Sequence, residues 1–193
     1  MSYSVPTNEL TLSDMKGYRT AAVEAGISRA MSLGIARVRE ELVVRDALPF
    51  TDFGAPAGNG WLTEQYITFG GVPTAGAWIS AFSSGALPLN VPQLARTKIA
   101  VFYGWADTMA NPICVGVRFR VGANGATTKA VFLPQMAIDA KMEPDSYFTE
   151  PVVYDPEDFV YIELYGVGVA TPAGGEVTPF RCLIIERVGG TVS

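Results

Sequence analysis

The 193-residue chain contains no histidine and only two cysteines. Without an imidazole it cannot build a Ser-His-Asp or Cys-His nucleophilic site, or bind zinc through histidine. Cys114 and Cys182 lack the C-x-x-C spacing of a metal or redox motif. We expect two buried thiols, with a single bridge between two strands as the alternative. The sequence therefore predicts neither a catalytic residue nor a cofactor.

Charged residues and long apolar runs are also scarce. Only 17% of the residues are charged and 49% are hydrophobic, which favours a folded domain over a disordered chain. The longest nearly uninterrupted apolar run, residues 99–106, is far shorter than the ~18 residues of a membrane span, so we expect none. The net charge of -5 argues against direct nucleic-acid binding. The first eleven residues lack the features of a signal peptide, which predicts synthesis in the cytoplasm.

A composition shift divides the chain into two expected parts. Residues 49–193 hold 12 of the 13 prolines, whereas residues 10–45 carry helical signals. Thr11 or Ser13 can cap a helix that continues to about residue 45, and Asp14 suits its first turn. We therefore predict an N-terminal arm with an amphipathic helix over residues 1–48 and a second domain over residues 49–193.

One face of the expected helix combines apolar and small residues. Small residues recur every four positions, and apolar residues every three to four, which gives eight candidate interface residues: Ala22, Gly26, Ala30, Gly34, Val23, Ile27, Met31 and Val38. Each interior glycine costs a helix about 1 kcal/mol relative to alanine, so this row needs a reason. Small side chains allow another backbone to approach closely. Two interpretations remain open, a helix that packs on its own domain and one that docks on a neighbouring subunit.

After Trp61 the hydrophobic period changes from that of a helix to that of a strand. Residues 113–121 alternate, with valines and Phe119 on one face and Arg118 and Arg120 on the other. Asn124-Gly125 predicts a hairpin to a return strand at 127–133. Further strands are expected at 62–69, 77–82, 98–105, 158–169 and 177–188. The chain is thus predicted to be mainly β, an antiparallel β-sandwich of jelly-roll type with an N-terminal α-helical arm.

Acidic residues concentrate between positions 139 and 163. This acidic belt has eight acids and one base, a charge of -7 in 25 residues. Asp145, Asp155 and Asp158 are candidate calcium ligands, although D-x-D-x-D-G spacing is absent. A small hydrolase with paired carboxylates is a second interpretation, and a solvated acidic edge is a third. The arm holds six bases and three acids in residues 16–45, so belt and arm could also pair between subunits.

Trp61, Trp78 and Trp105 provide the main alternative function. Tryptophans can stack on sugars, so a carbohydrate-binding β-sandwich module is one interpretation of these residues. Core and interface aromatics are the other.

In profile, the whole chain resembles virion structural proteins, the jelly-roll capsid, cement or decoration subunits. The resemblance lies in the helical segment at 10–45 followed by an apolar, Gly/Pro-rich domain at 50–190. It implies a non-enzymatic, self-assembling protein of a capsid, cement layer or tail. Its partners would be copies of itself and other structural subunits, and it would reside in the virion.

Overall fold

The structure is a computed structural model that describes residues 4–6, 10–48, 52–53, 76–80, 93–106, 114–122, 125–132, 145–166 and 180–188. This part of the chain is mainly β, with strands in two antiparallel sheets and one α-helix, α1 (Leu12–Ser32). A short 3-10 helix spans Arg39–Glu41. The strands are β1 (Ser4–Pro6), β2 (Leu42–Asp46), β3 (Ala77–Ser80), β4 (Lys98–Ala106), β5 (Cys114–Val121), β6 (Thr127–Phe132), β7 (Asp145–Tyr154), β8 (Tyr161–Gly166) and β9 (Phe180–Arg187).

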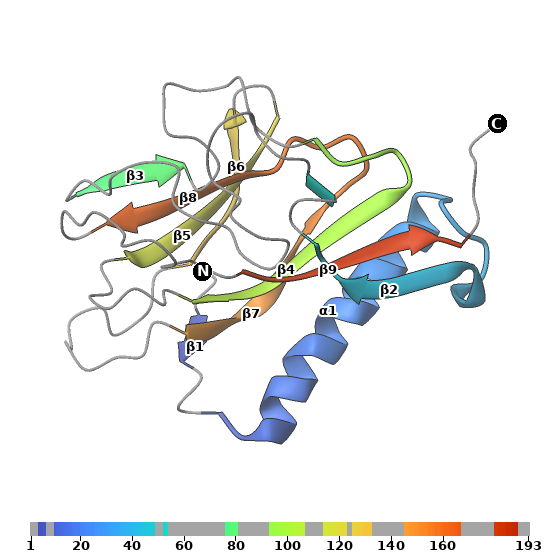
Figure 1. The fold of residues 1–193 in the computed structure, drawn as a ribbon, viewed down its shortest axis with the longest axis horizontal. Coiled ribbons are helices and arrows are strands. Elements are labelled where there is room, and N and C mark those ends of the chain that lie inside the picture. The colour runs from blue at the N-terminus through green and yellow to red at the C-terminus, as the bar shows by residue number, and fades with distance from the viewer. Residues whose placement is uncertain are drawn as a thin grey trace.

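The strands follow a nested order. The larger sheet runs β1-β7-β4-β9-β2 and the smaller sheet runs β3-β8-β5-β6 (Figure 1). Strand β5 pairs with β6, β4 with β7, β3 with β8 and β2 with β9, each antiparallel. Among β2 to β9, only β5 and β6 are successive strands of one sheet; every other step along the chain changes sheet.

Helix α1 begins at a capping box and ends at a glycine. The Thr11 hydroxyl accepts a hydrogen bond from the Asp14 N–H, and the Asp14 carboxylate accepts one from the Thr11 N–H, as the sequence predicts for Thr11. Gly34 has a φ of 73°, and the Ile35 N–H donates to the Ala30 carbonyl. This Schellman motif stops the helix. The prediction of a helix to residue 45 was therefore wrong, and residues 42–46 form β2 instead.

The helix covers the outer face of the larger sheet, where it lies against β4, β7 and β9 (Figure 1). Ala22 and Ala30 pack there against Ile99, Val101 and Leu183, which belong to β4 and β9. Because β1 and β2 join the same sheet, residues 4–6 and 10–48 do not form a separate arm; they supply two strands and the covering layer of the β domain.

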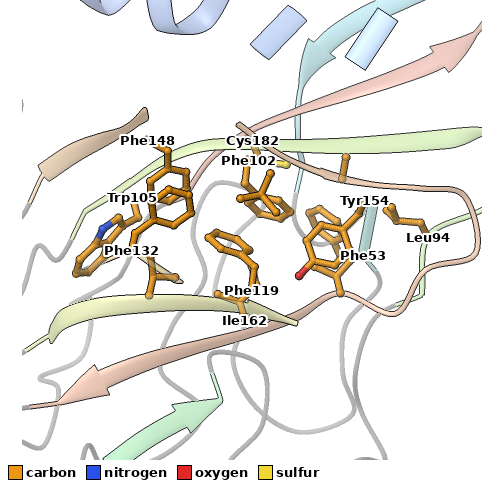
Figure 2. Close-up of a cluster of buried hydrophobic side chains, with 14 of the residues drawn as sticks. Phe53, Leu94, Phe102, Trp105, Phe119, Phe132, Phe148, Tyr154, Ile162 and Cys182 are labelled. Atoms are coloured by element: carbon orange, nitrogen blue, oxygen red, sulfur yellow. The ribbon is translucent and has the colours of Figure 1, made fainter. Parts of the chain in front are cut away.

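The main core lies between the two sheets and is rich in aromatic rings. Figure 2 shows Phe102 and Cys182 from the larger sheet opposite Phe119 and Ile162 from the smaller one. Phe119 packs on Phe102 with ring centroids 5.2 Å apart and on Phe148 at 5.5 Å. Burial of such side chains is worth about 1.5–3 kcal/mol each, so this interface between the sheets dominates the stability of the fold.

Most expected strands are found, although their predicted ends at 81–82, 113, 133, 167–169 and 177–179 lie outside the described residues. The predicted strands at 77–82, 98–105, 113–121, 127–133, 158–169 and 177–188 correspond to β3, β4, β5, β6, β8 and β9. The predicted strand at 62–69 lies outside the described residues. The prediction missed β1, β2 and β7, of which β7 runs through the acidic belt.

Candidate functional site

The small-residue row lies under the helix, not on its exposed side. Ala22 and Ala30 are fully buried, and Gly26 lies so close to the sheet that a Cβ there would contact Ile185 and come within 2.8 Å of Val101 Cγ2. This close approach within one chain explains the interior glycine. The expectation that these positions dock on a neighbouring subunit is corrected to packing on the chain's own sheet.

The other candidate interface residues divide into three groups. Ile27 is buried, and Val23 packs partly against the same cluster under the helix. Gly34 terminates the helix, so it is not part of a helical face. Met31 and Val38 are exposed, although Val38 follows the helix and does not belong to its stripe. Of these five residues, Met31 and Val38 are the large apolar ones that are exposed to another molecule.

Four exposed apolar residues belong to segments that meet at one end of the larger sheet. The end of α1, the start of β2 and the end of β9 lie together there (Figure 1). Val188 is 57% exposed, and its N–H donates to the Glu41 carbonyl, while the Glu41 N–H donates to the Val38 carbonyl. Met31 and Leu33 are exposed at the nearby helix end. We call these four residues, Met31, Leu33, Val38 and Val188, the sheet-end patch.

A buried ion network lies beside this patch on the opposite face of the sheet from the helix. The Asp52 side chain is fully buried and accepts hydrogen bonds from Arg45 at 2.7 and 2.6 Å and from Lys98 at 2.7 Å. The Leu48 N–H donates a further bond of 2.8 Å. Arg45 Nε also donates to Glu186 at 2.9 Å. The network therefore ties Asp52 to β2, β4 and β9.

The charges in this network stabilise one another. Burial raises the pKa of Asp52, but the hydrogen bonds from Arg45 and Lys98 outweigh burial and bring it below its usual value. The hydrogen bond to Asp52 is the main reason that the pKa of Arg45 is raised. Since a carboxylate with these partners stays ionised and paired, Asp52 is suited to fixing the chain and not to proton transfer.

The predicted calcium ligands do not converge. Asp145 begins β7 while Asp155 follows its end, so about ten residues of strand, roughly 30 Å, separate them. Asp155 accepts two hydrogen bonds from Arg29, and Asp158 Oδ2 accepts one from the Asp155 N–H and lies 3.5 Å from Lys129 Nζ. The expected three-carboxylate site is corrected accordingly. In the described segments no three acidic or cysteine side chains are close enough to hold a metal ion.

The tryptophans do not form a common platform. Trp105 is only 1% exposed within the core, so it cannot stack on a sugar. On the outer face of the smaller sheet, Trp78 lies against Tyr165 and under the guanidinium of Arg118, 4.5 Å from the ring centroid. Trp61 lies outside the described residues.

Arg118 connects this aromatic pair to a buried acid. Its Nε donates to Glu163 at 2.6 Å, and Arg120 Nη1 lies 3.4 Å from the same carboxylate. Glu163 is the most buried acid of the belt among the described side chains, and two arginines pair with it. This cluster stabilises the sheet face and orients Trp78.

The structure bears on two further predictions, the state of the cysteines and the membrane span. Cys182 is a free, buried thiol whose pKa burial raises, and the Cys114 side chain lies outside the description. The alternative prediction, a disulfide bridge between Cys114 and Cys182, is therefore wrong. None of the helices in the described ranges has the length and hydrophobicity to cross a bilayer.

Sequence reasoning missed the ion network completely. Asp52, Lys98 and Glu186 stand far apart in the sequence, and no local motif links them. The register of β4 with β9 places Lys98 opposite Glu186, and β2 pairs Val43 with the same glutamate. Only knowledge of these pairings could have found the network.

A scan against protein-family models, a search of curated proteins and a search of solved structures each found no match.

Proposed function

We propose that this protein is a non-enzymatic structural subunit of a virus particle, a capsid, cement or tail-associated protein that associates with copies of itself and with other structural subunits. The sheet-end patch is the observation that carries the proposal. Soluble monomers bury most of their large apolar side chains, and a group of exposed ones marks a contact surface. Here the exposed group lies at one end of the larger sheet, in the last turn of α1 and in the segments that follow α1 and β9.

We assign the two sheets to a jelly roll, and the nested strand order supports this assignment. Strands β2 to β9 pair about the β5–β6 hairpin, and all other successive strands change sheet. Eight strands arranged as two interlocked Greek keys have this order. Jelly rolls occur in viral capsid proteins and also in lectins and cupins, so the fold favours the proposal without deciding it.

The use of charged side chains is a further argument for a structural role. Arg29, Arg45 and Arg118 each bind a carboxylate of their own chain, as do Lys98 and Arg96. Such pairs hold segments together and leave those carboxylates without the freedom that general acid–base catalysis requires. The described ionisable side chains therefore act mainly in ion pairs that connect segments of the same chain.

A charged substitution in the patch tests the proposal. Val188→Glu combined with Leu33→Glu places two acids on the contact surface, so the untagged protein should form smaller assemblies in mass photometry. Leu12→Glu is the matched control, since Leu12 is 68% exposed at the opposite end of α1 and an acid suits a helix start. Assemblies that are unchanged by the double variant, with its circular dichroism spectrum intact, would contradict a role for the patch. A stable monomer retained by a carbohydrate column would favour a sugar-binding module instead.

A further inference from the structure

Strand β2 forms an edge of the larger sheet, and half of its backbone points away from β9. The Ala47 N–H donates to the Cys182 carbonyl and the Val188 N–H donates to the Glu41 carbonyl. The backbone N–H and C=O groups of successive residues in a strand point to opposite sides. Residues 43 and 45 therefore also direct theirs to β9, whereas Leu42, Val44 and Asp46 direct theirs outward. The Leu42 N–H bonds Arg39.

Four backbone hydrogen-bonding groups at this edge thus have no hydrogen-bond partner among the described residues. They are the carbonyls of Leu42 and Val44 and the N–H groups of Val44 and Asp46. Natural sheets protect such edges with short strands, proline or outward charges. The other edges follow this rule: β1 has three residues and Pro6, β3 has four residues, and β6 has the exposed run Thr127 to Lys129.

Strand β2 lacks this protection. Its five residues begin with Leu42-Val43-Val44, and its two charges are engaged within the chain. Arg45 binds Asp52 and Glu186, and Asp46 binds Arg19 at 3.2 Å. The Leu42 and Val44 side chains pack toward α1, but among the described elements only β9 lies along β2, so the edge of β2 away from β9 is open.

We propose that β2 pairs antiparallel with β2 of a second copy of this chain, about a two-fold axis at Val44. This inference rests on the proposed function and specifies one of its contacts. With Val44 opposite Val44 of the partner subunit, Leu42 lies opposite Asp46 of the partner subunit. All four open groups then find partners, giving four intermolecular hydrogen bonds and one continuous sheet across two subunits.

Charge selects both the partner and the register. In this register neither Arg45 nor Asp46 faces its own copy, whereas a shift that places Asp46 opposite Asp46 of the partner subunit brings like charges together. Charges near the sheet-end patch are also paired within the chain, since Arg39 binds Glu24 and Arg187 lies 3.7 Å from Glu41. Although the whole chain carries -5, two copies can meet here without net repulsion.

Cysteine cross-linking of the full chain tests the pairing and its register. In Val44→Cys the two Cα atoms would be about 5.5 Å apart, within the range of a disulfide. In Asp46→Cys the two residues would be offset by four positions, about 13 Å, which is too far. Mild oxidation should therefore convert Val44→Cys to a linked dimer, while Asp46→Cys and the unmodified protein, the control for its two native cysteines, remain unlinked.

The outcomes separate this inference from the proposed function. Cross-linking of Asp46→Cys but not Val44→Cys would overturn the register. Large assemblies in which neither variant cross-links would overturn the β2 contact and leave the structural role standing, whereas a monomer at every concentration would overturn both. Val44→Pro provides a second measurement. Proline removes an N–H that faces away from β9, so it should reduce assembly size while the circular dichroism spectrum is retained.

Discussion

Asp155 accepts two parallel hydrogen bonds from Arg29, 2.8 Å from Nε and 2.6 Å from Nη2, across 126 positions of sequence. The bond from Arg29 is the main reason that the pKa of Asp155 is lowered. This pair joins the basic N-terminal segment to the acidic belt. The charge complementarity expected between neighbouring subunits is thus satisfied, at this position, inside one chain.

The same pair leads to a prediction about calcium. Because Arg29 and Lys129 neutralise Asp155 and Asp158, the turn offers a divalent cation little net negative charge. Addition of EDTA to untagged protein should leave its melting temperature unchanged, and subsequent excess Ca²⁺ should do the same. A rise of several degrees on adding Ca²⁺ would show that these carboxylates bind the ion after all.

The ion network should make the largest polar contribution to stability. Asp52→Asn should lower the free energy of unfolding at pH 7 by roughly 3 kcal/mol, because it leaves Arg45 and Lys98 partly buried beside a neutral amide. Asp46→Asn breaks only an exposed pair and should cost less than about 1 kcal/mol. Urea unfolding of the three proteins measures the difference.

The contribution of Asp52 should also depend on pH in a defined direction. Its pKa is lower in the folded protein, so its stabilisation is present above the unfolded value of about 3.9 and is lost as pH falls through the folded value. The difference between wild type and Asp52→Asn should be constant near neutral pH and shrink below about pH 4. A difference that grows on acidification would contradict the assignment of the network.

Two glycines of α1 should respond in opposite ways to alanine. Gly17 has no atom within 4 Å of an added Cβ, so Gly17→Ala should stabilise the protein by about 1 kcal/mol through helix propensity alone. Gly26→Ala forces a methyl group against Ile185 and Val101 and should destabilise it by roughly 1–2 kcal/mol despite the same gain. Equal stabilisation of both variants in thermal melts would mean that the helix does not pack on the sheet through Gly26.

Gly34 tests the end of the helix. Nothing crowds this position, but its φ of 73° is unfavourable for other residues, so Gly34→Ala should cost about 1 kcal/mol. Gly34→Asn should cost less, since asparagine tolerates the left-handed region. If instead alanine raised the melting temperature, the helix would continue past Ser32, as the apolar spacing alone had indicated.

The pattern of side chains along single strands was sufficient to predict most of the β structure. Val117 and Phe119 alternate with Arg118 and Arg120, and the former pair is in the core while the latter lies on the outer face. Local spacing could not place residues 42–46, because Leu42 continues the helical period and only the left-handed turn at Gly34 ends it. Strand β7 was missed because its acids suggested a solvated loop.

The candidate site was much less accessible from sequence than the fold. A row of small residues shows that another backbone approaches closely, but it does not say whether that backbone belongs to the same chain, as it does at Gly26. The charged partners of Asp52 come from β2 and β4, and Arg45 extends the network to Glu186 of β9, so the network depends on strand pairings that are not local. The unpaired backbone groups at the edge of β2 can be identified only when its register with β9 is known.

The mass distribution of the untagged protein across a range of concentrations tests the central claim most directly. If the chain is a structural subunit, mass photometry should show discrete assemblies of many copies whose abundance increases with concentration. A single species at the monomer mass of 20.6 kDa under all conditions would contradict the proposed function.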